Sequence, residues 1–117
     1  MYEICDQPEI FSHIDEAFDF IFIRGYDNDG TYGYMALDFR APKMCIVHLE
    51  MTRFTAGVLK SLKGDWANIV ARLKKDGIKH LATQRLGVLA DYGPWLKFIR
   101  HFGFTDVQQI VSSVQNI

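Results

Sequence analysis

The hydrophobic pattern in the first half of the chain predicts three strands separated by two turns. Residues 18–26 (FDFIFIRGY), 32–40 and 44–51 (MCIVHLEM) are rich in aromatic and β-branched side chains, which is typical of strands. The segment Asp27-Asn28-Asp29-Gly30 between the first two is a dense turn signal. Before the third strand, Ala41-Pro42-Lys43 includes a proline that has no N–H to donate within a sheet. We therefore expect an antiparallel meander of three strands.

The helical period of about 3.6 residues occurs on both sides of this meander. Ile10, Ile14 and Phe18 follow one another at a spacing of four, which predicts a helix over residues 8–18. A longer amphipathic helix is predicted over residues 55–76, where the recurring apolar residues are Val58, Leu62, Trp66, Ile69, Val70 and Leu73.

After the long helix, the pattern predicts that the sheet continues. Residues 78–83 form a short apolar strand, and a strand–helix–strand unit joins parallel neighbours. A short helix opened by Pro94 and ended by Gly103 should precede a last strand over residues 105–114. The predicted fold class is α/β (α+β), a single domain over residues 1–117. Its mixed central sheet combines the antiparallel meander with a parallel β-α-β crossover.

Composition narrows the classes of partner. The chain has 117 residues and a formal net charge of −1, so there is no basic excess for nucleic acid or an anionic membrane. No apolar run approaches the ~20 residues that span a bilayer, and Met1–Asp6 lacks the pattern of a secretory signal. Cys5 and Cys45 have no Cys-x-x-Cys spacing, and the four histidines are dispersed. We expect a cytoplasmic protein with reduced thiols, no metal site, and no nucleic-acid or membrane partner.

Two segments resemble the GNAT superfamily of N-acetyltransferases. Ile46-Val47-His48-Leu49-Glu50-Met51, running into the long helix, is similar to the family's fourth strand and central helix. Residues 95–104 (WLKFIRHFGF) are similar to its penultimate helix and closing Gly-Phe, in the form common among short phage-encoded members. The resemblance covers residues 18 to 114 and implies an acyl-CoA N-acyltransferase-like fold.

The resemblance also implies an acetyl-CoA site at the start of the long helix. In the family, backbone N–H groups there hold the cofactor's pyrophosphate, because a helix N-terminus attracts anions. The family pattern is Gln/Arg-x-x-Gly-x-Gly/Ala, and the matching stretch here is Arg53-Phe54-Thr55-Ala56-Gly57-Val58. Arg53 matches the first position of the pattern. Ala56 stands at the position of the first glycine, Val58 stands at the position of the second small residue, and Gly57 lies one position after the first glycine. The cofactor-binding residues implied are Met51, Arg53, Thr55, Ala56 and Gly57; alternatively, this stretch simply begins an amphipathic helix.

The same resemblance suggests catalytic groups. Glu50 matches a strand glutamate that often serves as the general base, and strand alternation places His48 on its face. The backbone N–H near Glu50 or Met51 would be the oxyanion donor. The family's acidic tyrosine corresponds to Ile99, so Tyr92 is the candidate general acid. Alternatively, His48 and Glu50 face solvent or are partnered across the sheet, and Tyr92 is a loop aromatic.

These residues support two functional hypotheses. The first is an acetyl-CoA-dependent N-acetyltransferase-like protein of phage or bacterial origin, acting on a small-molecule or peptide amine that the sequence does not identify. The second is a catalytically inactive member of the fold that serves as a binding or structural protein. An unrelated α+β binding module is a more distant third. A homodimer, in which the partner completes the site, is a further expectation.

Overall fold

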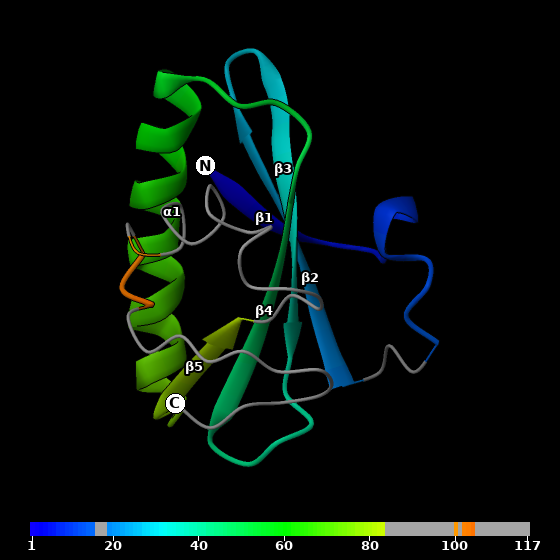
Figure 1. Cartoon of the computed structure of the whole chain (residues 1–117), viewed down its shortest axis with the longest axis vertical. Helices are drawn as coiled ribbons and strands as arrows, with labels where there is room; N and C mark the ends of the chain where they lie inside the picture. Colours follow the sequence, from blue (N-terminus) through cyan, green and yellow to red (C-terminus); the bar gives the residue numbers. More distant parts are fainter. Residues whose placement is uncertain (16–18, 84–99, 101, 105–117) are drawn as a thin grey trace, which may run out of the picture.

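A single mixed sheet organises the described part of the chain, which comprises residues 1–15, 19–83, 100 and 102–104 of a computed structural model (Figure 1). The sheet has five strands in the order β1-β2-β3-β4-β5. Helix α1 lies against one face, and the segment that follows β1 lies on the other (Figure 1). The strands are β1 (Tyr2–Cys5), β2 (Phe20–Asp27), β3 (Gly30–Asp38), β4 (Met44–Met51) and β5 (His80–Thr83).

The topology confirms the predicted meander and the predicted parallel crossover. β2, β3 and β4 are antiparallel neighbours in chain order. β4 and β5 are parallel, with Met44 opposite His80 and Val47 opposite Thr83. Both predicted turns also form. Gly30 closes the β2–β3 hairpin with φ of +106°, and Lys43 before β4 has φ of +59°.

Helix α1 (Ala56–Lys75) is one continuous helix, as its apolar period predicts. It begins where the Thr55 side chain accepts a hydrogen bond from the Val58 N–H at 3.1 Å. It stops two residues before Gly77, whose φ of +93° is readily adopted by glycine, and the Ile78 N–H donates back to the Leu73 carbonyl at 3.0 Å.

The main core lies between α1 and the sheet. One stripe of the helix is buried there, comprising Val58, Leu62, Trp66, Ile69 and Leu73. It packs on side chains from three strands, which include Ile23 of β2, Tyr32, Met35 and Leu37 of β3, and Cys45 and Val47 of β4. The inward face of α1 is therefore the one expected from the sequence, and Cys45 is buried as a free thiol.

The opposite face of the sheet carries a smaller apolar cluster. Phe11, Phe22 and Ala36 form its buried part, and Phe20 packs beside them. Phe11 comes from the 3-10 helix η1 (Glu9–Phe11) and is 2% exposed, whereas Ile10 is 40% exposed. This short 3-10 helix covers that part of the face. The described residues before β2 contain no longer helical segment than this one.

The predicted helix over residues 8–18 is wrong. Gln7 provides the physical reason, because its side-chain amide donates to the carbonyls of Phe11 at 2.9 Å and Ile14 at 3.0 Å. In an α-helix these carbonyls would accept from N–H groups four residues later, so the amide competes with helix propagation. Residues 16–18 lie outside the described part.

Strand β1 had no residue range among the predicted elements. It pairs antiparallel with β2, from Tyr2 opposite Gly25 to Cys5 opposite Phe22. A strand of four residues at a sheet edge has too few apolar positions to show a period in the sequence. The predicted helix after Pro94 and the predicted strand over 105–114 fall mainly outside the described residues. Gly103, which was predicted to end the helix after Pro94, has φ of +89°.

Trp66 is the test of the α1 packing. It is 8% exposed, and its indole N–H donates to the Phe102 carbonyl at 3.3 Å. We expect Trp66→Ala to lower the free energy of unfolding by about 3–5 kcal/mol, because it removes a large buried side chain and leaves a cavity. Urea unfolding measures the change. The exposed Lys63→Ala, on the same helix, should shift the free energy by less than about 0.5 kcal/mol; equal small effects in both variants would contradict the packing.

Candidate functional site

The end of β4 that leads into α1 has an edge that β5 does not cover within the described residues. β3 pairs with β4 from Ile46 to Met51, whereas β5 pairs with it only from Met44 to Val47. The Thr83 hydroxyl, at the last described residue of β5, donates to the Val47 carbonyl at 2.9 Å.

The orientation of the backbone groups along this edge follows from the antiparallel register. The Thr52 N–H donates to the Tyr32 carbonyl of β3 at 3.0 Å, so alternate residues counted back from Thr52 bond to β3. Leu49 and Met51 fall between them and direct their N–H and C=O groups toward the β5 side. Met51 is the implied site residue of this edge. Its backbone N–H and C=O groups are directed toward the β5 side, and its side chain packs against the core under α1.

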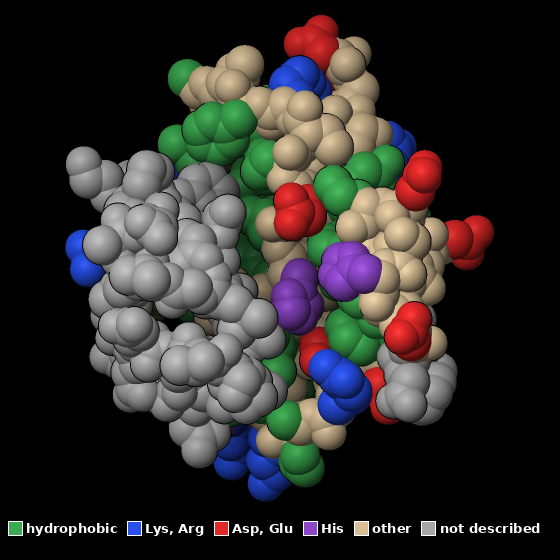
Figure 2. All heavy atoms as spheres, turned by 45° about the vertical axis from the view of Figure 1, so that its right-hand side comes forward, with side chains coloured by type: hydrophobic (Ala, Val, Ile, Leu, Met, Phe, Trp, Pro, Cys, Tyr) green, Lys and Arg blue, Asp and Glu red, His purple; other side chains and the backbone are tan. Residues whose placement is uncertain are grey.

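Side chains along β4 alternate between the two faces, as predicted. Cys45 and Val47 belong to the core under α1. His48 lies on the other face, where its ring stacks with Phe20 at a centroid distance of 6.5 Å. Glu50 is exposed on the same face by alternation. Figure 2, which brings this side of the molecule forward, shows two histidine side chains next to each other with acidic side chains nearby.

The surroundings of His48 favour its neutral form. Burial lowers the pKa of its imidazole below the ordinary value, and the positive charge of Arg40 and the neighbouring His13 act in the same direction. Asp38 and Glu50 oppose this effect only in part. His48 lies two residues before Glu50 and on the same face of the strand, and a neutral imidazole can accept a proton, so His48 and Glu50 are both candidate bases on this face.

Arg53 has a structural partner that the sequence analysis missed. Its guanidinium donates to the carboxylate of Asp27 and to the Gly30 carbonyl, the latter at 3.1 Å. The hydrogen bond from Arg53 lowers the pKa of the Asp27 carboxyl. The loop before α1 is thereby tied to the β2–β3 hairpin. Asp27 had been assigned only to a turn, and no local pattern links it to a residue 26 positions away.

The first turn of α1 leaves backbone N–H groups without helical acceptors at Ala56 and Gly57. Thr55 satisfies the N–H of Val58, and its carbonyl accepts from the Leu59 N–H at 2.9 Å. The N–H groups of Ala56 and Gly57 belong to the first turn, which has no intrahelical acceptors. Both residues are exposed, and a Cβ built on Gly57 would meet only Thr55 Oγ1, at 3.7 Å. Val58 is fully buried and directs its side chain into the core, away from this surface.

The implied site residues thus form a continuous path. Glu50 and Met51 lie at the end of β4, and Arg53, Thr55, Ala56 and Gly57 lead from there into α1. Tyr92 lies outside the described residues. Within residues 1–15, 19–83, 100 and 102–104, no group of three or more acidic, histidine or cysteine side chains is placed to hold a metal ion. In that same part of the chain, no helix is long and apolar enough to cross a bilayer.

Comparison with known proteins identifies a similar fold among solved structures but no similar sequence family. No family model matches the chain. No curated protein matches it either. Among solved structures, an aminoglycoside acetyltransferase from an uncultured soil metagenomic sample, determined in complex with sisomicin, superposes with a TM-score of 0.55. The alignment covers 97% of this chain and 77% of that protein at 13% sequence identity. Together with the mixed sheet and the β4-α1-β5 crossover, this similarity shows that the chain has an acyl-CoA N-acyltransferase-like fold.

Proposed function

We propose that the chain is an acetyltransferase-like protein that binds acetyl-CoA where β4 meets α1 and transfers the acetyl group to an amine. The observation that carries the proposal is the continuity between the end of β4 and the first turn of α1. The edge of β4 at Leu49 and Met51, which no described residue of β5 pairs with, leads directly to the exposed residues Ala56 and Gly57 at the start of α1. The similarity to a solved acetyltransferase supports the same assignment.

The diphosphate of the cofactor is assigned to the first turn of α1. The positive end of the helix dipole and the N–H groups of Ala56 and Gly57 attract an anion, and their small side chains allow a close approach. Arg53 serves this site by holding the loop through Asp27, since its guanidinium is already engaged there. This assignment differs from a direct Arg53–phosphate contact.

The reacting acetyl group is assigned to the edge of β4. The Met51 N–H, directed toward the β5 side, is the proposed donor to the oxyanion of the tetrahedral intermediate. Glu50 is the proposed general base that takes the proton of the attacking amine, with the neutral His48 beside it. Tyr92 remains the proposed general acid. The acceptor is a small-molecule or peptide amine, and a cytoplasmic location, a phage-type relationship and a completing homodimer remain predictions.

A specific observation favours the second candidate function, a catalytically inactive binding or structural protein of the same fold. Arg53 is committed to the hairpin, and Ala56 stands where the family pattern has glycine. If these departures have removed cofactor binding, the first turn of α1 is an ordinary capped helix start. Binding of CoA separates the two functions.

We expect CoA to raise the melting temperature of the wild-type chain. Ligand at about a hundred times its dissociation constant stabilises the native state by about 2.7 kcal/mol, which corresponds to a shift on the order of 10 °C. Gly57→Glu should abolish the shift, because the added carboxylate repels phosphate at the helix N-terminus. Differential scanning fluorimetry with CoA and acetyl-CoA provides the measurement.

The matched control is Gly64→Glu, the same substitution in the middle of the same helix. Gly64 is exposed, and a Cβ there has no neighbour within 4 Å, so the CoA shift should persist. No shift of the wild-type chain at millimolar CoA would reject the cofactor site and favour the inactive binding protein. A shift that survives Gly57→Glu would place CoA elsewhere on the chain.

Glu50→Gln is expected to lower acetyl transfer by about a hundredfold while leaving the CoA-induced shift unchanged, because it removes a base without changing shape. Transfer is measured as CoA release from acetyl-CoA with a panel of primary amines that includes sisomicin. His48→Gln is the companion variant and should have the smaller effect. A rate within about twofold of wild type in Glu50→Gln would exclude Glu50 as the base, and a larger loss in His48→Gln would assign that role to His48.

A further inference from the structure

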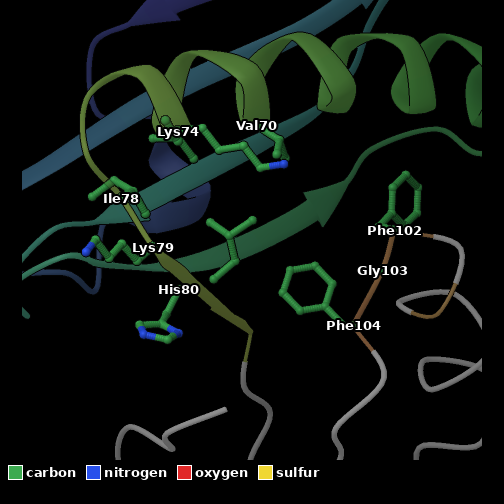
Figure 3. Close-up of a pocket in the computed structure, with 10 residues that line it drawn as sticks. Val70, Lys74, Ile78, Lys79, His80, Phe102, Gly103 and Phe104 are labelled. Atoms are coloured by element: carbon green, nitrogen blue, oxygen red, sulfur yellow. The ribbon is translucent and has the colours of Figure 1, made fainter.

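A cavity lies at the C-terminal end of α1, away from the proposed cofactor site at its other end. It has a volume of about 280 Å³ and lies between the C-terminal part of α1, the start of β5 and the segment Phe102–Phe104 (Figure 3). Lys74 lies 17 positions after Gly57 along the helix, a separation of about 25 Å at 1.5 Å per residue. The cavity is therefore distinct from the residues assigned to acetyl-CoA.

Well-defined contacts hold both walls of this cavity. On one side, the turn from α1 to β5 is closed by the hydrogen bond from the Ile78 N–H to the Leu73 carbonyl. On the other side, Trp66 holds the aromatic segment. Its indole N–H donates to the Phe102 carbonyl, and its ring lies 6.4 Å from Phe102 and 5.9 Å from Phe104 between centroids.

The lining combines an apolar floor with a positively charged rim. Leu73, Ile78 and Phe104 provide aliphatic and aromatic surface, and the Lys74 side chain extends from α1 across the side facing Val70 (Figure 3). Lys79 and His80 are also part of the described lining, which contains no carboxylate.

The described residues beside the rim add further positive charge. The N–H groups of Lys79 and His80 both donate to the carbonyl of Lys43, at 2.9 and 3.2 Å, which brings another lysine beside the start of β5. The acidic residue that follows α1, Asp76, forms an ion pair with Arg72 at 3.6 Å. Within the described residues, lysine side chains therefore gather at this end of a chain whose formal net charge is −1.

We propose that this cavity is a binding site for a small aromatic carboxylate, with the ring between Leu73 and Phe104 and the carboxylate at Lys74. An apolar cavity with a few convergent polar groups is the usual form of a small-molecule site. Its volume of about 280 Å³ is just below the range of about 300–1,000 Å³ for drug-sized ligands, which fits one or two fused rings. An ammonium group at the rim then selects an anion over a neutral analogue.

The probe is 2-naphthoate, titrated into the isotopically labelled chain and followed by amide chemical shifts. We expect saturable shifts centred on Leu73, Ile78, Leu81 and Phe104. Lys74→Met should raise the dissociation constant for 2-naphthoate about tenfold at low ionic strength, because the variant lacks a charged hydrogen-bond donor. Lys75→Met is the matched control, since Lys75 is the adjacent exposed lysine of the same helix turn and does not line the cavity. Its affinity should stay at the wild-type value.

Two further measurements test the chemistry and the location. The neutral 2-naphthylmethanol should bind about tenfold more weakly than 2-naphthoate, because it has no carboxylate for Lys74. Acetate should not bind, because it has no aromatic ring for the apolar part of the cavity. Gly57→Glu should leave 2-naphthoate binding unchanged, so the result is independent of the cofactor site. The proposal is overturned by equal losses in the two lysine variants, by equal affinity for the alcohol, by shifts centred elsewhere, or by no shifts at millimolar 2-naphthoate.

Discussion

The packing of α1 across one face of the sheet is the interaction on which the remaining structure depends. A buried stripe on the helix contacts side chains of β2, β3 and β4, which are themselves adjacent only because the meander forms. The same helix carries the chain back so that β5 can pair in parallel with β4. Its two ends therefore have fixed positions: one beside the exit of β4 and the other beside the entry to β5. Both proposed ligand sites lie at those ends.

A buried carboxylate specifies how α1 sits on the sheet. Asp65 lies in the inward stripe and is 7% exposed, yet it is hydrogen-bonded by the Tyr32 hydroxyl at 2.5 Å and by the Met1 amino group at 2.9 Å. Burial, together with the hydrogen bond to Asp65, raises the pKa of Tyr32, which therefore stays protonated as the donor. Gly25 completes this arrangement, because a Cβ there would come within 2.4 Å of the Tyr32 ring. Such directional contacts permit fewer registers than apolar packing alone.

The sequence was sufficient for the elements whose side chains repeat over many residues. β4 begins and ends where its apolar run predicts, and α1 differs from its predicted range by one residue at each end. The helix proposed over residues 8–18 failed because one amide, that of Gln7, captures two backbone carbonyls. The partner of Arg53 was likewise missed, because its ion pair with Asp27 depends on the folded positions of a hairpin and a loop. Periodicity reports which face is buried, whereas single long-range polar contacts leave no periodic trace.

The Arg53–Asp27 contact has a consequence for attempts to redesign the loop before α1. Introducing glycine at Ala56, to resemble the family pattern more closely, would change the backbone but would leave the guanidinium with the hairpin. Releasing it by substituting Asp27 would also remove the acceptor of the Asp29 N–H, and with it one hydrogen bond of the turn. A designer who wants a phosphate-binding arginine here has to rebuild the tip of the β2–β3 hairpin at the same time. The two segments, far apart in the chain, form a single unit for engineering.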